Sequence, residues 1–126
     1  MRKIESAFNI LKRRPYVATL PIHLQVEITN ACNLQCTTCH RDVLYPKPRN
    51  MTLDIFKNII DDVKPIKVNC SGLGEPFLNP EIFEMVRYAK SSGATVNCAT
   101  NFTRVTHKID EIIQIAYPDG VPHAVP

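Results

Sequence analysis

The sequence predicts an α/β fold in which parallel strands alternate with helices that cover the sheet. Short apolar or alternating stretches, typical of strands, are separated by stretches whose apolar residues recur at helical spacing. Proline, glycine and asparagine mark most of the boundaries between them. With 126 residues, of which 44% are hydrophobic and 21% charged, the composition is typical of one globular domain. The chain is shorter than a complete barrel of about 200 residues or more.

The first fourteen residues carry most of the excess positive charge. Ile4, Phe8 and Leu11 recur there at helical spacing between basic flanks, which predicts an amphipathic helix and a linker over residues 1–21. Acidic and basic residues nearly balance over residues 22–126, so no nucleic-acid partner is expected. No apolar run approaches the roughly 18 residues of a membrane span, and no secretory pattern opens the chain. We therefore expect no membrane partner and a cytoplasmic location.

The core begins with a strand followed by a helix. Residues 22–28 alternate apolar and polar positions after Pro21, which predicts the first strand. Thr52 stands where a helix N-cap is expected, and apolar residues at helical spacing continue to Val63. Pro65 then ends this first core helix.

A second strand and helix follow, and then two further strands. Asn79 as N-cap, Pro80 at the first helical position and Gly93 just after the last turn delimit the second core helix. A connection of about a dozen residues, near the minimum for a parallel crossover, joins the last two strands. The second, third and fourth strands are predicted at residues 66–70, 95–99 and 112–116.

Three unusual segments follow the first three predicted strands. They are a cysteine cluster at residues 32–39, a glycine turn at residues 71–76, and Thr100–Asn101. Because ligands of parallel α/β folds bind at the carboxyl ends of the strands, these segments predict one shared site.

Five cysteines, an odd number without a secretion signal, predict reduced thiols instead of a disulfide framework. Cys32, Cys36 and Cys39 are spaced C-x-x-x-C-x-x-C, so their thiolates could converge on one inorganic centre. A 4Fe–4S cluster held by three cysteines would keep an open position on one iron. Cys70 and Cys98 lie on predicted strands and are most simply buried packing residues.

Three other interpretations of the cysteine cluster stay open at this point. A structural zinc site needs four ligands, and His40 beside Cys39 is an awkward fourth. Residues 36–40 also match the C-x-x-C-H pattern of c-type haem attachment, although that route needs export. A thioredoxin-like redox pair would give Cys32 no role.

Residues 27–39, Glu-Ile-Thr-Asn-Ala-Cys-Asn-Leu-Gln-Cys-Thr-Thr-Cys, resemble the cluster loop of the radical S-adenosylmethionine (radical SAM) superfamily. The resemblance extends through Met51 and the following helix, through residues 72–80, Gly-Leu-Gly-Glu-Pro-Phe-Leu-Asn-Pro, and to Thr100–Asn101. It covers about residues 15–103, in the style of members that carry an extra C-terminal cluster domain. The fold that it implies is a partial TIM-type parallel (β/α) barrel of about four strands.

The resemblance implies that Cys32, Cys36 and Cys39 hold a 4Fe–4S cluster whose unligated iron chelates S-adenosylmethionine. An electron, from a donor such as ferredoxin or flavodoxin, would cleave the sulfonium bond. The products would be methionine and a 5'-deoxyadenosyl radical that abstracts hydrogen from an unknown substrate. No catalytic residue is assigned beyond the cluster.

The resemblance also implies a set of cofactor contacts. The glycine turn is similar to the family's Gly-Gly-Glu-Pro motif, which meets the methionyl amino group, and glycines let the backbone approach a ligand closely. Asn101 resembles a polar cofactor contact, and its alternative role is a turn or cap residue. Glu27 is either a polar group near the cofactor or an exposed strand carboxylate. The implied cofactor-binding residues are Gly72, Gly74, Glu75, Pro76, Asn101 and His40.

Two functions of different class follow from the length of the chain. The family core usually has six strand–helix units, and the fifth and sixth are expected to be absent. Residues 22–126 are therefore either an incomplete radical SAM core domain that becomes competent with a complementing chain, or a truncated, non-catalytic iron–sulfur-binding remnant. The substrate would be chosen by the absent units.

Overall fold

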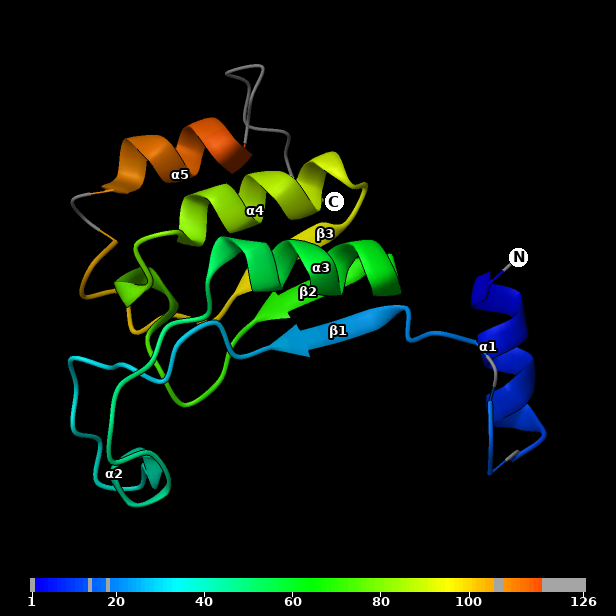
Figure 1. The fold of residues 1–126 in the computed structure, drawn as a ribbon, viewed down its shortest axis with the longest axis horizontal. Helices are drawn as coiled ribbons and strands as arrows, with labels where there is room; N and C mark the ends of the chain where they lie inside the picture. Colours follow the sequence, from blue (N-terminus) through cyan, green and yellow to red (C-terminus); the bar gives the residue numbers. More distant parts are fainter. Residues whose placement is uncertain (1, 14, 18, 106–107, 117–126) are drawn as a thin grey trace.

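The computed structural model describes residues 2–13, 15–17, 19–105 and 108–116. Strands and helices alternate along the core (Figure 1). In chain order the elements are α1 (Arg2–Leu11), β1 (His23–Val26), α2 (Arg41–Leu44), α3 (Leu53–Val63), β2 (Lys67–Cys70), the 3-10 helix η1 (Pro76–Leu78), α4 (Ile82–Ser91), β3 (Thr95–Cys98) and α5 (Ile109–Ala116).

The three described strands form one parallel sheet in the order β1–β2–β3. Val26, Cys70 and Cys98 are register partners, so the three strands end at one edge. α3 connects β1 to β2, α4 connects β2 to β3, and both helices lie on the same side of the sheet (Figure 1). The predicted α/β architecture of parallel strands with covering helices is confirmed.

The α3 helix has the boundaries that its sequence predicts. The Thr52 hydroxyl accepts a hydrogen bond from the Ile55 N–H at 3.5 Å, which satisfies one free donor of the first turn. Lys64 ends the helix in the left-handed conformation, with φ 48°. Local capping thus fixes α3 between the first two strands.

The α4 helix begins at Ile82, two residues after the predicted start at Pro80. The difference arises because η1 occupies the preceding segment and Asn79 lies in the turn between the two helices. The Asn79 Oδ1 atom accepts a hydrogen bond of 2.9 Å from the Glu81 N–H, so Asn79 still caps the chain reversal. Gly93, with φ 86°, follows the helix as predicted.

One hydrophobic core lies between the sheet and the helices α3 and α4. Apolar side chains from the strands and from both helices are buried there, and their burial holds α3 and α4 against one face of the sheet. The other face of the sheet is polar, since Gln25, Asn69 and Asn97 are register partners on alternate positions of the strands. Core residues with at most 1% exposure are Ile28, Phe56, Ile60, Val68, Cys70, Ile82, Met85 and Ala89.

The predicted fourth strand at residues 112–116 is wrong, because these residues belong to α5. Ile112 and Ile115 pack against the core, whereas Ile109 and Ile113 are each 50% exposed. A short apolar run is compatible with either a strand or a helix, and packing against α4 selects the helix here. The described part of the sheet therefore has three strands instead of about four.

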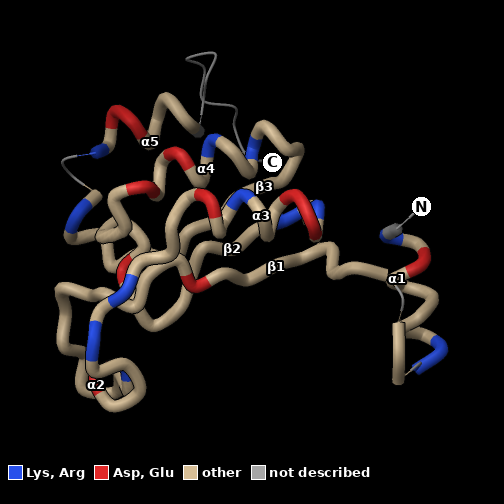
Figure 2. The backbone as a smooth tube through the Cα atoms, in the orientation of Figure 1, with Lys and Arg blue, Asp and Glu red and all other residues tan. Residues whose placement is uncertain are grey.

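The predicted N-terminal amphipathic helix is present as α1, and it lies apart from the sheet (Figure 1). Ile4, Ile10 and Leu11 are more than three-quarters exposed. Figure 2 shows Lys and Arg in α1 and after α2, with both signs of charge mixed over α3 and α4. The division at residue 21 stays a prediction, and residues 117–126 lie outside the described residues. In the described part of the chain, no helix has both the length and the hydropathy of a membrane-spanning segment.

Candidate functional site

Three loops meet where the strands end. We name them the cysteine loop (residues 29–40), the glycine turn (residues 71–76) and the β3 loop (residues 99–105). The Glu75 N–H donates a hydrogen bond of 2.8 Å to the Ala31 carbonyl, which joins the glycine turn to the cysteine loop. The Asn101 N–H donates a bond of 2.7 Å to the Glu75 Oε2 atom, which joins the β3 loop to both. The sequence prediction that these segments share one edge agrees with this geometry.

Gly74 marks the closest approach between the glycine turn and the cysteine loop. A Cβ atom there would overlap the Thr29 carbonyl oxygen and lie 2.9 Å from the Ala31 carbonyl oxygen. A Cβ atom at Gly72 would meet the Glu27 side chain instead. Contact between two backbones therefore requires glycine at position 74, whereas position 72 faces a side chain that can move.

Glu75 is the central buried group, with 2% of its surface exposed. Its Oε1 atom accepts hydrogen bonds from the Phe77 N–H at 3.1 Å and the Thr100 hydroxyl at 2.7 Å. Pro76, which directly follows Glu75, is also buried and is the first residue of η1. A buried carboxylate is costly unless donors surround it, and Glu75 is stabilised by donors from its own turn and from the β3 loop.

The Asn101 side chain reaches across to the cysteine loop. Its Nδ2 atom donates to the Cys32 Sγ atom at 3.8 Å and to the Asn33 Oδ1 atom at 3.1 Å. The Asn33 amide donates in turn to the Thr103 hydroxyl at 2.7 Å, and that hydroxyl donates to the Asn101 Oδ1 atom at 2.7 Å. The three side chains form a closed ring of hydrogen bonds beside Cys32.

The three loop cysteines are free thiols with different exposure. Cys32 is half-buried, whereas Cys36 and Cys39 are exposed at either end of a turn closed by a bond of 3.0 Å from the Cys39 N–H to the Cys36 carbonyl. Within the described ranges, no three His, Cys, Asp or Glu side chains are gathered as metal ligands. Three unpaired thiols on one accessible segment fit the thiolate donor set of an iron–sulfur cluster. The loop would have to close to bring them together.

Two side chains beside the cysteine loop differ in their environment. His40 is exposed at the start of α2 and makes no capping hydrogen bond through its side chain. Arg41 pairs with Asp42 at 2.6 Å, while its Nε atom is buried and has no partner among the described residues. A hollow of about 500 Å³ lined by Ala31, Cys32, Arg41 and Tyr45, among others, opens here. The lining of this hollow includes both members of the Arg41–Asp42 pair.

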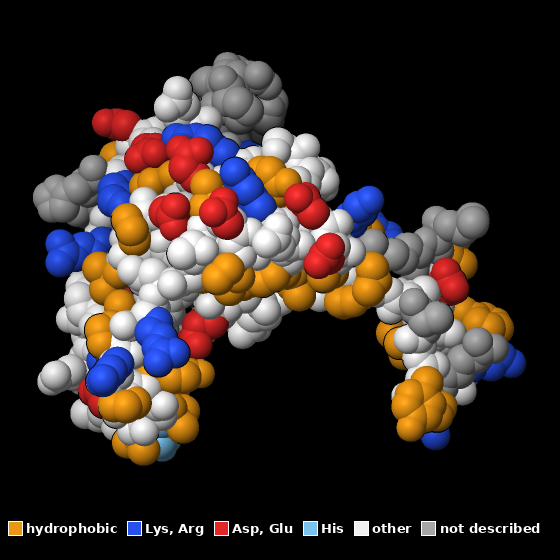
Figure 3. Space-filling model, viewed as in Figure 1, with side chains coloured by type: hydrophobic (Ala, Val, Ile, Leu, Met, Phe, Trp, Pro, Cys, Tyr) orange, Lys and Arg blue, Asp and Glu red, His pale blue; other side chains and the backbone are white. Residues whose placement is uncertain are grey.

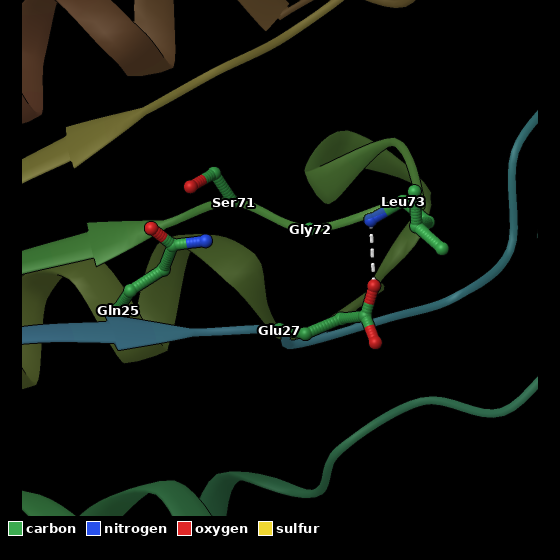
Figure 4. A pocket seen from close by; sticks show the side chains of 5 residues that line it. All are labelled: Gln25, Glu27, Ser71, Gly72 and Leu73. Carbon is green, nitrogen blue, oxygen red and sulfur yellow. Dashed lines mark hydrogen bonds between the residues drawn. The ribbon is translucent and has the colours of Figure 1, made fainter. Parts of the chain in front are cut away.

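A second hollow, of about 530 Å³, lies at the glycine turn (Figure 4). Gln25, Glu27 and Ser71 line it together with the start of the turn. The Glu27 Oε1 atom accepts a hydrogen bond of 2.6 Å from the Leu73 N–H. Glu27 is thus a half-buried group that holds the glycine turn, and it differs from a freely exposed strand carboxylate.

Cys70 and Cys98 lie side by side at the ends of β2 and β3, as register partners. Cys70 is fully buried, in agreement with its predicted packing role, and Cys98 is half-buried. The hydrogen bond with Cys98, together with burial, raises the pKa of the Cys70 thiol. The hydrogen bond from Cys70 lowers the pKa of the Cys98 thiol. The two shifts share their main cause, a hydrogen bond that Cys70 donates to Cys98.

Sequence reasoning did not single out Asn33, Thr103 or Arg41 as parts of the site. Asn33 directly follows Cys32, and Thr103 lies two residues after Asn101, so proximity to the recognised motifs was the available signal. The hydrogen bond between Asn33 and Thr103 joins residues that are 70 positions apart in the sequence, so only the tertiary structure can establish it.

The model of the radical SAM superfamily matches residues 26–125. A tungsten-containing aldehyde ferredoxin oxidoreductase cofactor-modifying protein from Pyrococcus furiosus is 32% identical over an alignment of 91 residues, and the match covers 69% of this chain and 26% of that protein. The AdoMet-dependent heme synthase of Methanosarcina barkeri is 39% identical over an alignment of 95 residues, and the match covers 71% of this chain and 27% of that protein.

A similar fold occurs in the crystal structure of BtrN in complex with AdoMet and 2-DOIA. The TM-score is 0.59 at 18% identity, over 75% of this chain and 44% of that one. The chain spans about a quarter of the length of the curated relatives described above. Members of the matched superfamily bind a 4Fe–4S cluster and S-adenosylmethionine. Because the family match covers most of the described core, including the cysteine loop, the glycine turn and the β3 loop, the chain belongs to the radical SAM superfamily.

Proposed function

We propose that this chain binds a 4Fe–4S cluster and S-adenosylmethionine at the carboxyl edge of its sheet and initiates radical chemistry on a substrate. The observation that carries this proposal is the hydrogen bonding through Glu75, which joins the cysteine loop, the glycine turn and the β3 loop. Membership of the superfamily indicates which cofactors the chain would bind. The geometry supplies one edge at which both would be held.

Each loop would contribute a different function. Cys32, Cys36 and Cys39 would hold the cluster, which supplies the electron for reductive cleavage of S-adenosylmethionine to methionine and a 5'-deoxyadenosyl radical. The glycine turn (Gly72, Gly74, Glu75, Pro76) and Asn101 would shape the S-adenosylmethionine site, with His40 on the exposed side.

The site also needs partners. A one-electron donor such as a ferredoxin or flavodoxin would reduce the cluster. Because Cys36 and Cys39 are exposed, the electron would travel only a short distance from the donor to the cluster. A complementing segment or chain would supply substrate contacts. Figure 3 shows hydrophobic side chains gathered around α2, where Val43 and Leu44 are 81% and 59% exposed. This apolar surface supports the proposal of a further covering partner.

The test is anaerobic reconstitution of the chain with iron and sulfide, followed by reduction in the presence of S-adenosylmethionine. We expect about four irons per chain and formation of 5'-deoxyadenosine, measured by mass spectrometry. Cys36→Ala should lose the iron without loss of folding, because Cys36 is exposed. Cys98→Ala is the matched control, since Cys98 lies outside the cysteine loop, and it should keep the iron.

The outcomes separate the two functions. Iron together with deoxyadenosine supports the enzyme. Iron without deoxyadenosine, even with an added low-potential donor, would limit the chain to cluster binding. Tightly bound zinc or covalent haem in place of iron would overturn the cluster assignment.

A further inference from the structure

The cysteine loop contains one thiol whose sulfur accepts a side-chain hydrogen bond in the described structure. The Asn101 Nδ2 atom lies 3.8 Å from the Cys32 Sγ atom, within the range of an N–H···S bond. Cys32 is also the least exposed of the three loop cysteines. A specific polar contact therefore distinguishes Cys32 from Cys36 and Cys39.

The orientation of the Asn101 amide is fixed by donors on its other side. The Oδ1 atom accepts from the Thr103 N–H at 3.0 Å and from the Thr103 hydroxyl at 2.7 Å. Because a backbone N–H can only donate, the oxygen must face Thr103 and the NH₂ group must face Cys32. The hydrogen-bonded ring through Asn33 closes this arrangement.

The backbone holds Asn101 in place at some cost. Phe102, which lies between Asn101 and Thr103, has φ 66°, a left-handed conformation that is unfavourable for a residue other than glycine. Its side chain is 66% exposed, so packing of the ring does not account for this conformation. The turn lets Thr103 fold back on Asn101, while the Asn101 N–H is bonded to buried Glu75. The strained backbone conformation of Phe102 thus occurs where the turn directs the Asn101 amide at the Cys32 sulfur.

Resting on the proposed function, we propose that Asn101 tunes the cluster by donating an N–H···S hydrogen bond to the thiolate of Cys32. Negative charge on the cluster sulfurs increases when the cluster is reduced, so a hydrogen-bond donor stabilises the reduced state more than the oxidised state. The bond from Asn101 raises the reduction potential and makes the cluster easier to reduce. Asn101 acts as a positioning and tuning residue through Cys32, and Glu75 sets its backbone.

The test is an equilibrium redox titration of the reconstituted chain, without S-adenosylmethionine, followed by EPR spectroscopy. Asn101→Ala should shift the midpoint potential to more negative values. Asn33→Ala is the matched control, because it breaks the same ring but removes no donor to sulfur, and its shift should be clearly smaller. Equal shifts in the two variants, or no shift in Asn101→Ala, would overturn the proposal.

A second measurement does not need the Asn101→Ala variant and covers the case in which that variant fails to load iron. In wild-type chain labelled with ¹⁵N at asparagine side chains, pulsed EPR of the reduced cluster should detect a coupled ¹⁵N nucleus. This coupling should persist in Asn33→Ala. A loaded wild-type cluster without the coupling would overturn this inference alone. Failure of the wild-type chain to load iron would overturn the proposed function, and this inference with it.

Discussion

The backbone N–H of Asn101 donates a 2.7 Å hydrogen bond to the Oε2 atom of Glu75, a carboxylate with 2% of its surface exposed. Glu75 is bonded through its own N–H to Ala31, so this one residue links the ends of all three strands. A buried carboxylate between loops makes their relative position sensitive to small chemical changes.

Glu75→Gln should lower the free energy of unfolding by about 1–3 kcal/mol. The Glu75 Oε1 atom accepts from two donors and the Oε2 atom from one. In either orientation the new amide NH₂ group would therefore face a backbone N–H, that of Phe77 or that of Asn101. Urea denaturation followed by circular dichroism measures the change. Glu84→Gln, which removes only an exposed pair with Arg87, should change stability by less than about 0.5 kcal/mol. Equal effects of the two substitutions would contradict the role of Glu75.

Gly74→Ala should destabilise the chain by about 1–3 kcal/mol, because the new methyl group forces two backbones apart. Gly72→Ala is the matched control and should cost less, because moving the Glu27 side chain breaks its one hydrogen bond to the Leu73 N–H but shifts no backbone. The two midpoints in the same urea titration give the comparison. If Gly72→Ala is the more damaging change, the close approach of Gly74 to the cysteine loop is not what restricts the turn.

Asn79→Ala should also destabilise the fold by about 1–3 kcal/mol. Asn79 is fully buried, and its Nδ2 atom donates to the Ile28 carbonyl at 2.8 Å and to the Met51 carbonyl at 3.0 Å. Removing it takes this donor from the Met51 carbonyl and leaves the Ile28 carbonyl with only the Met51 N–H as its donor. Asn58→Ala, at an exposed position of α3, should change stability by less than about 0.5 kcal/mol. Thermal or urea unfolding of both variants checks the difference.

Cys70→Ala should raise the pKa of Cys98, because the hydrogen bond from Cys70 is the main cause that lowers it. The Cys98 thiolate fraction then falls at neutral pH, and the pH midpoint of its alkylation by iodoacetamide moves upward. Peptide mass spectrometry can follow Cys98 separately from the other thiols. Cys36→Ala should leave that midpoint unchanged. A midpoint that stays constant or falls in Cys70→Ala would argue against the thiol pair.

Much of the fold and the outline of the site could be predicted from local sequence. The boundaries of α3 follow from Thr52 and the spacing of its apolar residues, and Gly93 marks the end of α4. The cysteine loop, the glycine turn and Asn101 could be assigned to one edge because parallel strands end together. These features depend on periodicity, capping and motif order, which are properties of neighbouring residues.

Other features depend on contacts between distant residues. Residues 112–116 are apolar enough for a strand, and only packing of Ile112 and Ile115 on the core makes them part of α5. The bond from Asn101 to Cys32 and the ring through Asn33 and Thr103 join segments about 70 residues apart. By itself the sequence determined α1, α3, α4, the three strands of the sheet and the candidate ligands. Tertiary structure alone decided which side chains meet, because hydrogen bonds and packing depend on distances that sequence order does not contain.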